Sequence, residues 1–270
     1  MVSSRWAQRV VDAPIRRFEG ETLTVPASNG TRSSYNVRPD YSEILIEPIA
    51  AMRLQLVPAI KGLLFYDASQ GRFYDILDPG YRPNFLDRTL TETTTLLGSM
   101  TSADYLYVGT VGPVGGFTVD MGGTVNAVAA TLSAQYVGIG KTWQTLTIAA
   151  DGTSSAGATL AQDGLVTITV PAGWTSATLE QVVTGAPVTR QLYWARYAVS
   201  DTLTAAIIVN NLSVVGEIAP GTDSTTAKTG GVWLKAAVEY TMDVDADVGA
   251  LEIMAQAAGA TTARVTWVAR

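Results

Sequence analysis

The sequence predicts an all-β protein that consists of an antiparallel β-sandwich, a second and smaller β unit, and an extended N-terminal arm. Short segments of alternating apolar and polar residues recur along the chain. Turns rich in Gly, Asp, Thr and Ser separate these segments at near-regular spacing. The chain is 270 residues long, above the usual domain size of about 100 to 150 residues, which fits two β-rich units.

Residues 1–40 have no clear hydrophobic period, and Pro14, Pro26 and Pro39 interrupt them. We expect an extended arm that lies on a neighbouring subunit, with packing inside its own domain as the alternative. The segment holds the only basic cluster, and nearby carboxylates offset it, so a protein partner fits better than DNA. The candidate interface residues are Arg5, Trp6, Arg9, Arg16, Arg17, Phe18, Arg32, Tyr35 and Arg38.

Residues 41–100 carry the first strands of the second β unit. Apolar residues alternate over 44–46 and again over 52–56, which favours strands over a helix. Residues 62–77 have the pattern of a hairpin with its turn at 67–71, and residues 78–85 predict a loop.

Residues 101–216 predict the main β-sandwich, because seven short strands with turns between them are typical of two packed antiparallel sheets. The expected strands are 105–109, 116–121, 131–137, 145–148, 165–170, 193–199 and 207–214. In the expected strand at 193–199, the period of two places Trp194 and Arg196 on the same face. That pair could form a stacking platform, but we favour Trp194 in a core with Arg196 at its edge. Trp143 and Trp174, at strand ends, are also expected in a core.

Residues 217–270 contain a connector rich in Gly, Thr and Ser, followed by four expected strands at 231–235, 238–242, 250–255 and 263–268. Four strands are too few for a secure core of their own. We therefore expect them to pair with the strands of residues 41–100 and to complete the second β unit from both ends of the chain.

The chain offers few groups for chemistry. It has no His and no Cys, and so lacks the commonest general base, the commonest metal ligand and the best nucleophile. Asp243, Asp245 and Asp247 alternate like part of a calcium loop, but no Glu closes the loop, and a solvated acidic strand edge fits better. Residues 138–142, GIGKT, lead into a strand and fit a hairpin turn, not a phosphate loop. We expect no enzyme activity, no cofactor and no metal.

The charge distribution argues against several partners. Charged residues make up 16% of the chain and hydrophobic residues 47%. This composition is typical of a protein whose surface is largely subunit contact; the alternative explanation is a source proteome that is rich in Ala and Val. Residues 91–270 hold seven Lys or Arg and fourteen Asp or Glu, a net charge of −7, which disfavours binding to nucleic acid. No signal-peptide pattern and no membrane-spanning apolar run is present, so we expect synthesis in a cytoplasm and no membrane contact.

Six segments, in this order and spacing, resemble a β-sandwich module of the Ig-like or jelly-roll type that recurs in structural proteins of tailed bacteriophages. They are DYLYVG at 104–109, TLSAQY at 131–136, WQTL at 143–146, DGTSS at 151–155, VTITVPAGW at 166–174 and YWARY at 193–197. The chain departs from the usual pattern at 137–141, where VGIGK replaces Trp-Asn-Gly, and in the longer connection 175–191. Residues outside this module match no pattern that we can name.

The resemblance implies a structural component of a tailed-phage virion, made in the host bacterial cytoplasm. Capsid decoration or cement is the first expectation, followed by a tail, collar or baseplate protein. The implied partners are other virion proteins and further copies of this chain. The alternative is an adhesion module that binds host-surface glycan through Tyr136, Trp174 and Tyr197, and an enzyme that degrades polysaccharide is disfavoured by the missing His.

Overall fold

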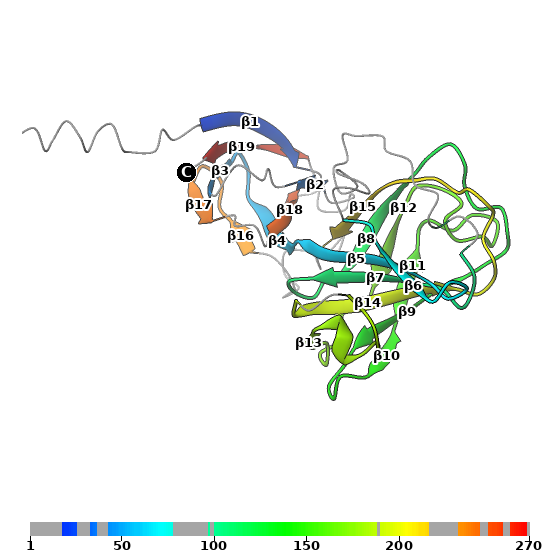
Figure 1. The fold of residues 1–270 in the computed structure, drawn as a ribbon. Helices are drawn as coiled ribbons and strands as arrows, with labels where there is room; N and C mark the ends of the chain where they lie inside the picture. Colours follow the sequence, from blue (N-terminus) through cyan, green and yellow to red (C-terminus); the bar gives the residue numbers. More distant parts are fainter. Residues whose placement is uncertain are drawn as a thin grey trace, which may run out of the picture.

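The structure is a computed structural model that describes residues 18–25, 33–36, 43–77, 97, 100–187, 190–215, 232–243, 248–255 and 260–268. In these ranges the protein is all-β, as the sequence predicts, with strands that pair antiparallel. The other regular element described is a short 3-10 helix, η1 (Leu179–Gln181). The strands form four sheets, which pack as two sandwiches that lie next to each other along the chain (Figure 1). No helix in the described ranges is long and apolar enough to cross a membrane.

The larger sandwich pairs a seven-stranded sheet with a four-stranded one. The seven-stranded sheet has the order β10-β9-β14-β7-β5-β6, with β13 paired to β14. Its strands are β5 (Ile60–Asp67), β6 (Arg72–Asp75), β7 (Tyr105–Thr110), β9 (Leu132–Val137), β10 (Trp143–Leu146), β13 (Ser176–Ala177) and β14 (Leu192–Val199). The four-stranded sheet has the order β11-β12-β8-β15, made of β8 (Gly116–Met121), β11 (Ile148–Asp151), β12 (Gly164–Ile168) and β15 (Val209–Val215).

The strands of the larger sandwich follow the predicted alternation closely. The expected strand at 145–148 is in fact two strands, because the chain leaves the seven-stranded sheet after Leu146 and enters the other sheet at Ile148. Residues 138–142 form the predicted hairpin turn between β9 and β10, in which the Gly138 amide donates to the Thr142 carbonyl at 2.9 Å.

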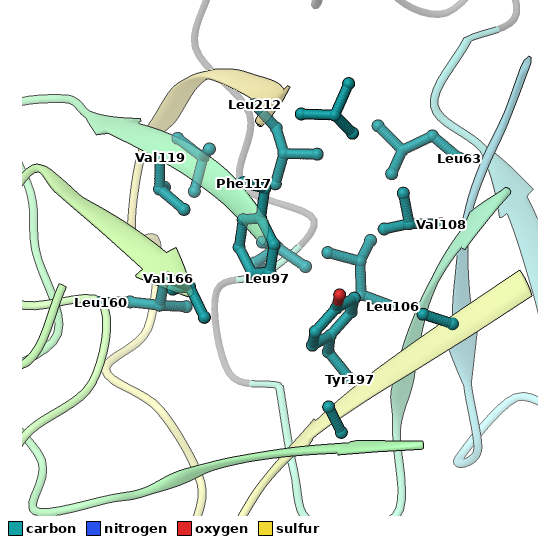
Figure 2. Packing of buried hydrophobic residues seen from close by; sticks show 14 of the residues in the cluster. Leu63, Leu97, Leu106, Val108, Phe117, Val119, Leu160, Val166, Tyr197 and Leu212 are labelled. Carbon is teal, nitrogen blue, oxygen red and sulfur yellow. The ribbon is translucent and has the colours of Figure 1, made fainter. Parts of the chain in front are cut away.

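The core of the larger sandwich lies between its two sheets. Figure 2 shows Phe117, Val119 and Val166 from the four-stranded sheet on one side of this core and Leu63, Leu106 and Tyr197 from the seven-stranded sheet on the other. The rings of Phe117 and Tyr197 meet edge to face with centroids 4.8 Å apart. Burial in this apolar layer raises the pKa of the Tyr197 phenol. A small apolar cavity of about 30 Å³ remains at the centre.

A second apolar layer lies on the outer face of the seven-stranded sheet. Trp194, on β14, is fully buried there, and its indole Nε1 donates to the Ala177 carbonyl at 3.1 Å. The indole lies directly over Gly62 on β5 and Gly109 on β7. The connection that contains β13 and η1 covers it, through buried Ala177 and Leu179. The core position predicted for Trp194 is therefore confirmed, and the long connection at 175–191 supplies its cover.

The smaller sandwich is built from both ends of the chain. One sheet, in the order β1-β19-β3-β17, contains β1 (Phe18–Val25), β3 (Glu43–Pro48), β17 (Tyr240–Asp243) and β19 (Thr261–Val268). The other, in the order β16-β4-β18-β2, contains β2 (Ser33–Asn36), β4 (Met52–Pro58), β16 (Val232–Leu234) and β18 (Val248–Ala255). Ile44, Met52, Ile253 and Trp267 are fully buried between the two sheets.

The strand pairing differs from the predicted division of the chain in two places. Within residues 1–40, β1 pairs with β19 and β2 with β18 of the same chain, so these two segments are sheet strands and not an extended arm. Gly20 and the polar residues around it hide the strand period, yet Leu23 of β1 is buried in the core. The hairpin of β5 and β6 belongs to the larger sandwich, because Leu63 and Phe65 enter that core.

Candidate functional site

The outer face of the seven-stranded sheet carries a row of polar and aromatic side chains beside the Trp194 layer. Arg196 lies on β14, two residues from Trp194 and on the same face, as the strand period predicts. In the sheet register it stands between Tyr107 of β7 and Gln135 of β9. Gln135 and Arg196 are half-buried, whereas Thr145, opposite Gln135 on β10, is exposed. This part of the face is therefore accessible to a ligand.

Two aromatic rings and an amide hold the Arg196 guanidinium. Its central carbon lies 4.4 Å from the ring centroid of Tyr105 and 4.5 Å from that of Trp143. Its Nε donates to the Gln135 side-chain oxygen at 2.7 Å. Ring faces attract a cation, and a planar guanidinium stacks well on them. These three contacts hold the side chain against the outer face of the sheet.

A pocket of about 320 Å³ opens beside this guanidinium. Its lining combines one cation with hydroxyl and amide groups from four segments of the sheet face: Ser102, Tyr105, Ser133, Ala134, Gln135, Thr145, Arg196, Ala198 and Val199. Among the described residues no carboxylate forms an ion pair with Arg196. A half-buried cation without a carboxylate partner can donate charge-assisted hydrogen bonds to an anion.

Aromatic side chains extend from the pocket across the sheet. The ring centroids of Tyr66 and Phe73 are 4.8 Å apart, and those of Phe73 and Tyr107 are 5.9 Å apart. Tyr107 then contacts Trp143, with centroids 5.8 Å apart. Burial raises the pKa of the Tyr107 phenol, and the hydrogen bond with Arg196 and the Arg196 charge oppose that rise. The pocket therefore continues into an aromatic surface that is half-buried at Tyr66, Phe73 and Trp143.

Trp143, predicted as a core residue, packs against the buried Trp194 layer from a half-buried position and is also a partner of Arg196. Its side chain is half-buried, and its indole Nε1 is enclosed without a hydrogen-bond partner. Contacts with the Tyr107 ring and the Arg196 cation hold the indole in place. Trp174, by contrast, is buried as predicted and donates its Nε1 to the Trp194 carbonyl at 3.2 Å.

The aromatic residues proposed from sequence for glycan binding are not on the surface. Tyr136, Trp174 and Tyr197 are all buried in the core of the larger sandwich. Tyr136 and Tyr197 occupy the inward-facing positions of β9 and β14, and the rings of Tyr136 and Trp174 contact each other there. Tyr105 and Trp143, beside Arg196, are half-buried aromatic residues on the outer face of the sheet. The sequence signal that could have located this face is the period of two, which places Tyr105 and Tyr107 on the same side of their strand.

Most of the predicted interface residues lie outside the described residues. These are Arg5, Trp6, Arg9, Arg16, Arg17, Arg32 and Arg38. The backbones of the other two are strand positions: Phe18 stands opposite Val268 in β19, and Tyr35 stands opposite Leu251 in β18.

Two buried or partly buried carboxylates of the larger sandwich hold turns. Asp104 accepts hydrogen bonds from the backbone amides of Ala68, at 2.8 Å, and Thr101, at 2.7 Å. Asp151 accepts from the hydroxyls of Thr153 and Thr159, both at 2.6 Å. These groups stabilise the native turns and are not directed into the Arg196 pocket. The arrangement around Arg196 can bind an anion, but it contains no paired acid and base.

EDTA is expected to leave the melting temperature of the protein unchanged. The described residues contain no group of three or more Asp or Glu side chains placed to hold a metal ion. Asp243 ends β17, and Asp245 and Asp247 lie outside the described residues. Differential scanning calorimetry with and without the chelator checks this expectation. A drop of several degrees would assign the three aspartates to a structural cation site.

Comparisons of the chain with protein-family models, with curated proteins and with solved structures give no match.

Proposed function

We propose that this protein is a structural component of a tailed-phage virion, located in the particle after synthesis in the host bacterial cytoplasm. It acts by protein–protein assembly, as a capsid decoration or cement protein or as a tail, collar or baseplate protein. Its partners are other virion proteins and copies of itself. The observation that carries this proposal is the ordered series of strand and turn motifs over residues 104–197, which resembles the phage β-sandwich module.

Two observations support an assembly role. The motif segments correspond to strands β7, β9, β10, β12 and β14 and to turns of one β-sandwich, so the resemblance falls on a single structural unit. The low share of charged residues, 16%, leaves much of the surface suited to subunit contact. Symmetric repetition would turn modest contacts of each copy into a stable particle.

Removal of residues 1–17 is expected to weaken assembly while the fold is kept. This truncation leaves all described strands intact, whereas removal of residues 1–40 would also delete β1 and β2. If the arginines of this segment contact a neighbouring subunit, the apparent dissociation constant of the assembly should rise about tenfold or more. Light scattering after size-exclusion chromatography measures this dissociation constant. Mass spectrometry of purified virions compares the incorporation of the truncated and full-length chains into particles.

Two outcomes would contradict parts of this proposal. Normal incorporation of the truncated chain would refute the role of residues 1–17. Absence of the full-length chain from virions of the phage that encodes it would refute the virion proposal itself. A matched control is the full chain with Arg264, an exposed residue of β19, replaced by Gln; this variant should assemble normally.

The Arg196 pocket favours a second candidate function, a module that binds host-surface glycan. An accessible aromatic surface next to hydroxyl and amide groups is the usual composition of a small-molecule binding site. Binding of purified polysaccharide by the isolated chain, without assembly, would support this function over the first. An assembly-competent chain that binds no polysaccharide would refute it.

A further inference from the structure

We infer that the pocket around Arg196 binds the carboxylate of an acidic sugar, such as a uronic acid unit of a polysaccharide. This inference deepens the second candidate function and does not depend on the virion proposal. It rests on the orientation of the guanidinium, on the composition of the pocket and on the aromatic surface beside it.

The guanidinium is already oriented for a planar anion. The rings of Tyr105 and Trp143 lie close to its face, at 4.4 and 4.5 Å from centroid to central carbon, and the Gln135 oxygen takes its Nε donor. The remaining donors are those of the terminal nitrogens: one hydrogen bond goes to the Tyr107 phenol, and the others can match two carboxylate oxygens. Because the side chain is held before binding, little conformational entropy is lost when the anion arrives.

The hydroxyl and amide groups of the pocket favour a sugar acid over a simple anion. Ser102, Ser133 and Thr145 are exposed and line the pocket together with Gln135. These side chains both donate and accept hydrogen bonds, as a ligand with several hydroxyl groups requires. A volume of about 320 Å³ is at the small end of ligand pockets, which suits one sugar unit.

The aromatic surface beside the pocket favours a ligand with apolar ring faces. Tyr105 borders the pocket and stands opposite Tyr66 of β5, which in turn stands opposite Phe73 of β6. All three rings are half-buried, so each presents part of its surface to solvent. The apolar C–H face of a pyranose can pack on such rings, whereas a phosphate ion has no apolar group. A polysaccharide can therefore bind with its acidic unit at Arg196 and the next unit over Tyr66.

Binding is best measured by isothermal titration calorimetry with the full-length chain and a short oligogalacturonate as the probe. We expect saturable binding, no binding of the fully methyl-esterified probe, and a dissociation constant raised about tenfold or more in Arg196→Gln. Arg196→Lys keeps the charge but loses the fork, and should also bind more weakly than the unchanged protein. Arg264→Gln removes an exposed arginine of the other sandwich and should bind like the unchanged chain.

Other results would overturn the inference. These are equal binding of the acid and its ester, no saturable binding of any acidic sugar by the folded protein, or tighter Arg196-dependent binding of inorganic phosphate or a glutamate-rich peptide. Trp143 fluorescence provides a second readout, because its ring contacts Arg196; a ligand-induced change that Trp143→Phe removes supports the site. If Arg196→Gln loses binding yet enters virions normally, the sugar site stands and is separate from assembly.

Discussion

Replacement of Trp194 by Ala is expected to lower the free energy of unfolding of the larger sandwich by about 3 to 5 kcal/mol. The indole is 0% exposed, and it fills the space between the seven-stranded sheet and the connection that carries β13 and η1. Its removal leaves a cavity over Gly62 and Gly109 and an unpaired carbonyl at Ala177. Urea unfolding monitored by circular dichroism measures the loss as a lower midpoint at unchanged slope.

The two glycines under the indole provide the matched control for this prediction. A methyl group on Gly62 would lie 2.3 Å from the Trp194 ring, closer than such contacts allow, whereas one on Gly109 would also meet Leu192 at 2.8 Å. Gly62→Ala should therefore destabilise the unchanged protein but cost much less when Trp194 is already Ala, a coupling that a double-mutant cycle detects. Additive effects of the two substitutions, or a near-neutral Trp194→Ala, would contradict the packing described here.

The fold of the larger sandwich follows from its sequence because each strand buries one face. Segments such as LYWARYAV at 192–199 alternate clearly, and the turns between them contain Gly and Asp. The partners of β5 and β6 could not be predicted in this way. Their pattern defines a hairpin, but which sheet it joins depends on where Leu63 and Phe65 find apolar contacts, and those contacts come from distant parts of the chain.

The Arg196 site could be predicted only in part for a related reason. The period of two within β14 is a local property, and it correctly places Arg196 on the face of Trp194. The approach of Tyr105, Gln135 and Trp143 depends on the register between β7, β9, β10 and β14, which a single sequence does not reveal. The predicted exposure of Tyr136 and Tyr197 for glycan binding was also wrong. The face of β9 and β14 that carries them is the one covered by the four-stranded sheet, and the sequence alone does not show which face is covered.

Replacement of Trp267 by Ala is expected to destabilise the smaller sandwich by about 3 to 5 kcal/mol and to leave the larger one folded. Trp267 is 1% exposed in the core between the two four-stranded sheets, and its indole Nε1 donates to the Glu21 carboxylate on β1. The substitution therefore removes core volume and one of the contacts that fasten the edge strand β1 to β19. Trp267 belongs to a buried cluster separate from that of the larger sandwich, although Val57 of β4 belongs to the latter, so the loss should remain local.

Hydrogen exchange measured by mass spectrometry separates local from global unfolding in this variant. Amides of β3 and β19 should exchange faster in Trp267→Ala, while those of β7 and β14 should keep their protection. Arg264→Ala on the same strand is the matched control: its side chain is 69% exposed, its ion pair with Glu47 at 3.4 Å is a surface pair, and its loss should cost at most about 1 kcal/mol. If β7 and β14 lose protection together with β19, the two sandwiches unfold as one cooperative unit. The coupling would then pass through Val57 of β4 and through the contacts of β15 with β4 and β18.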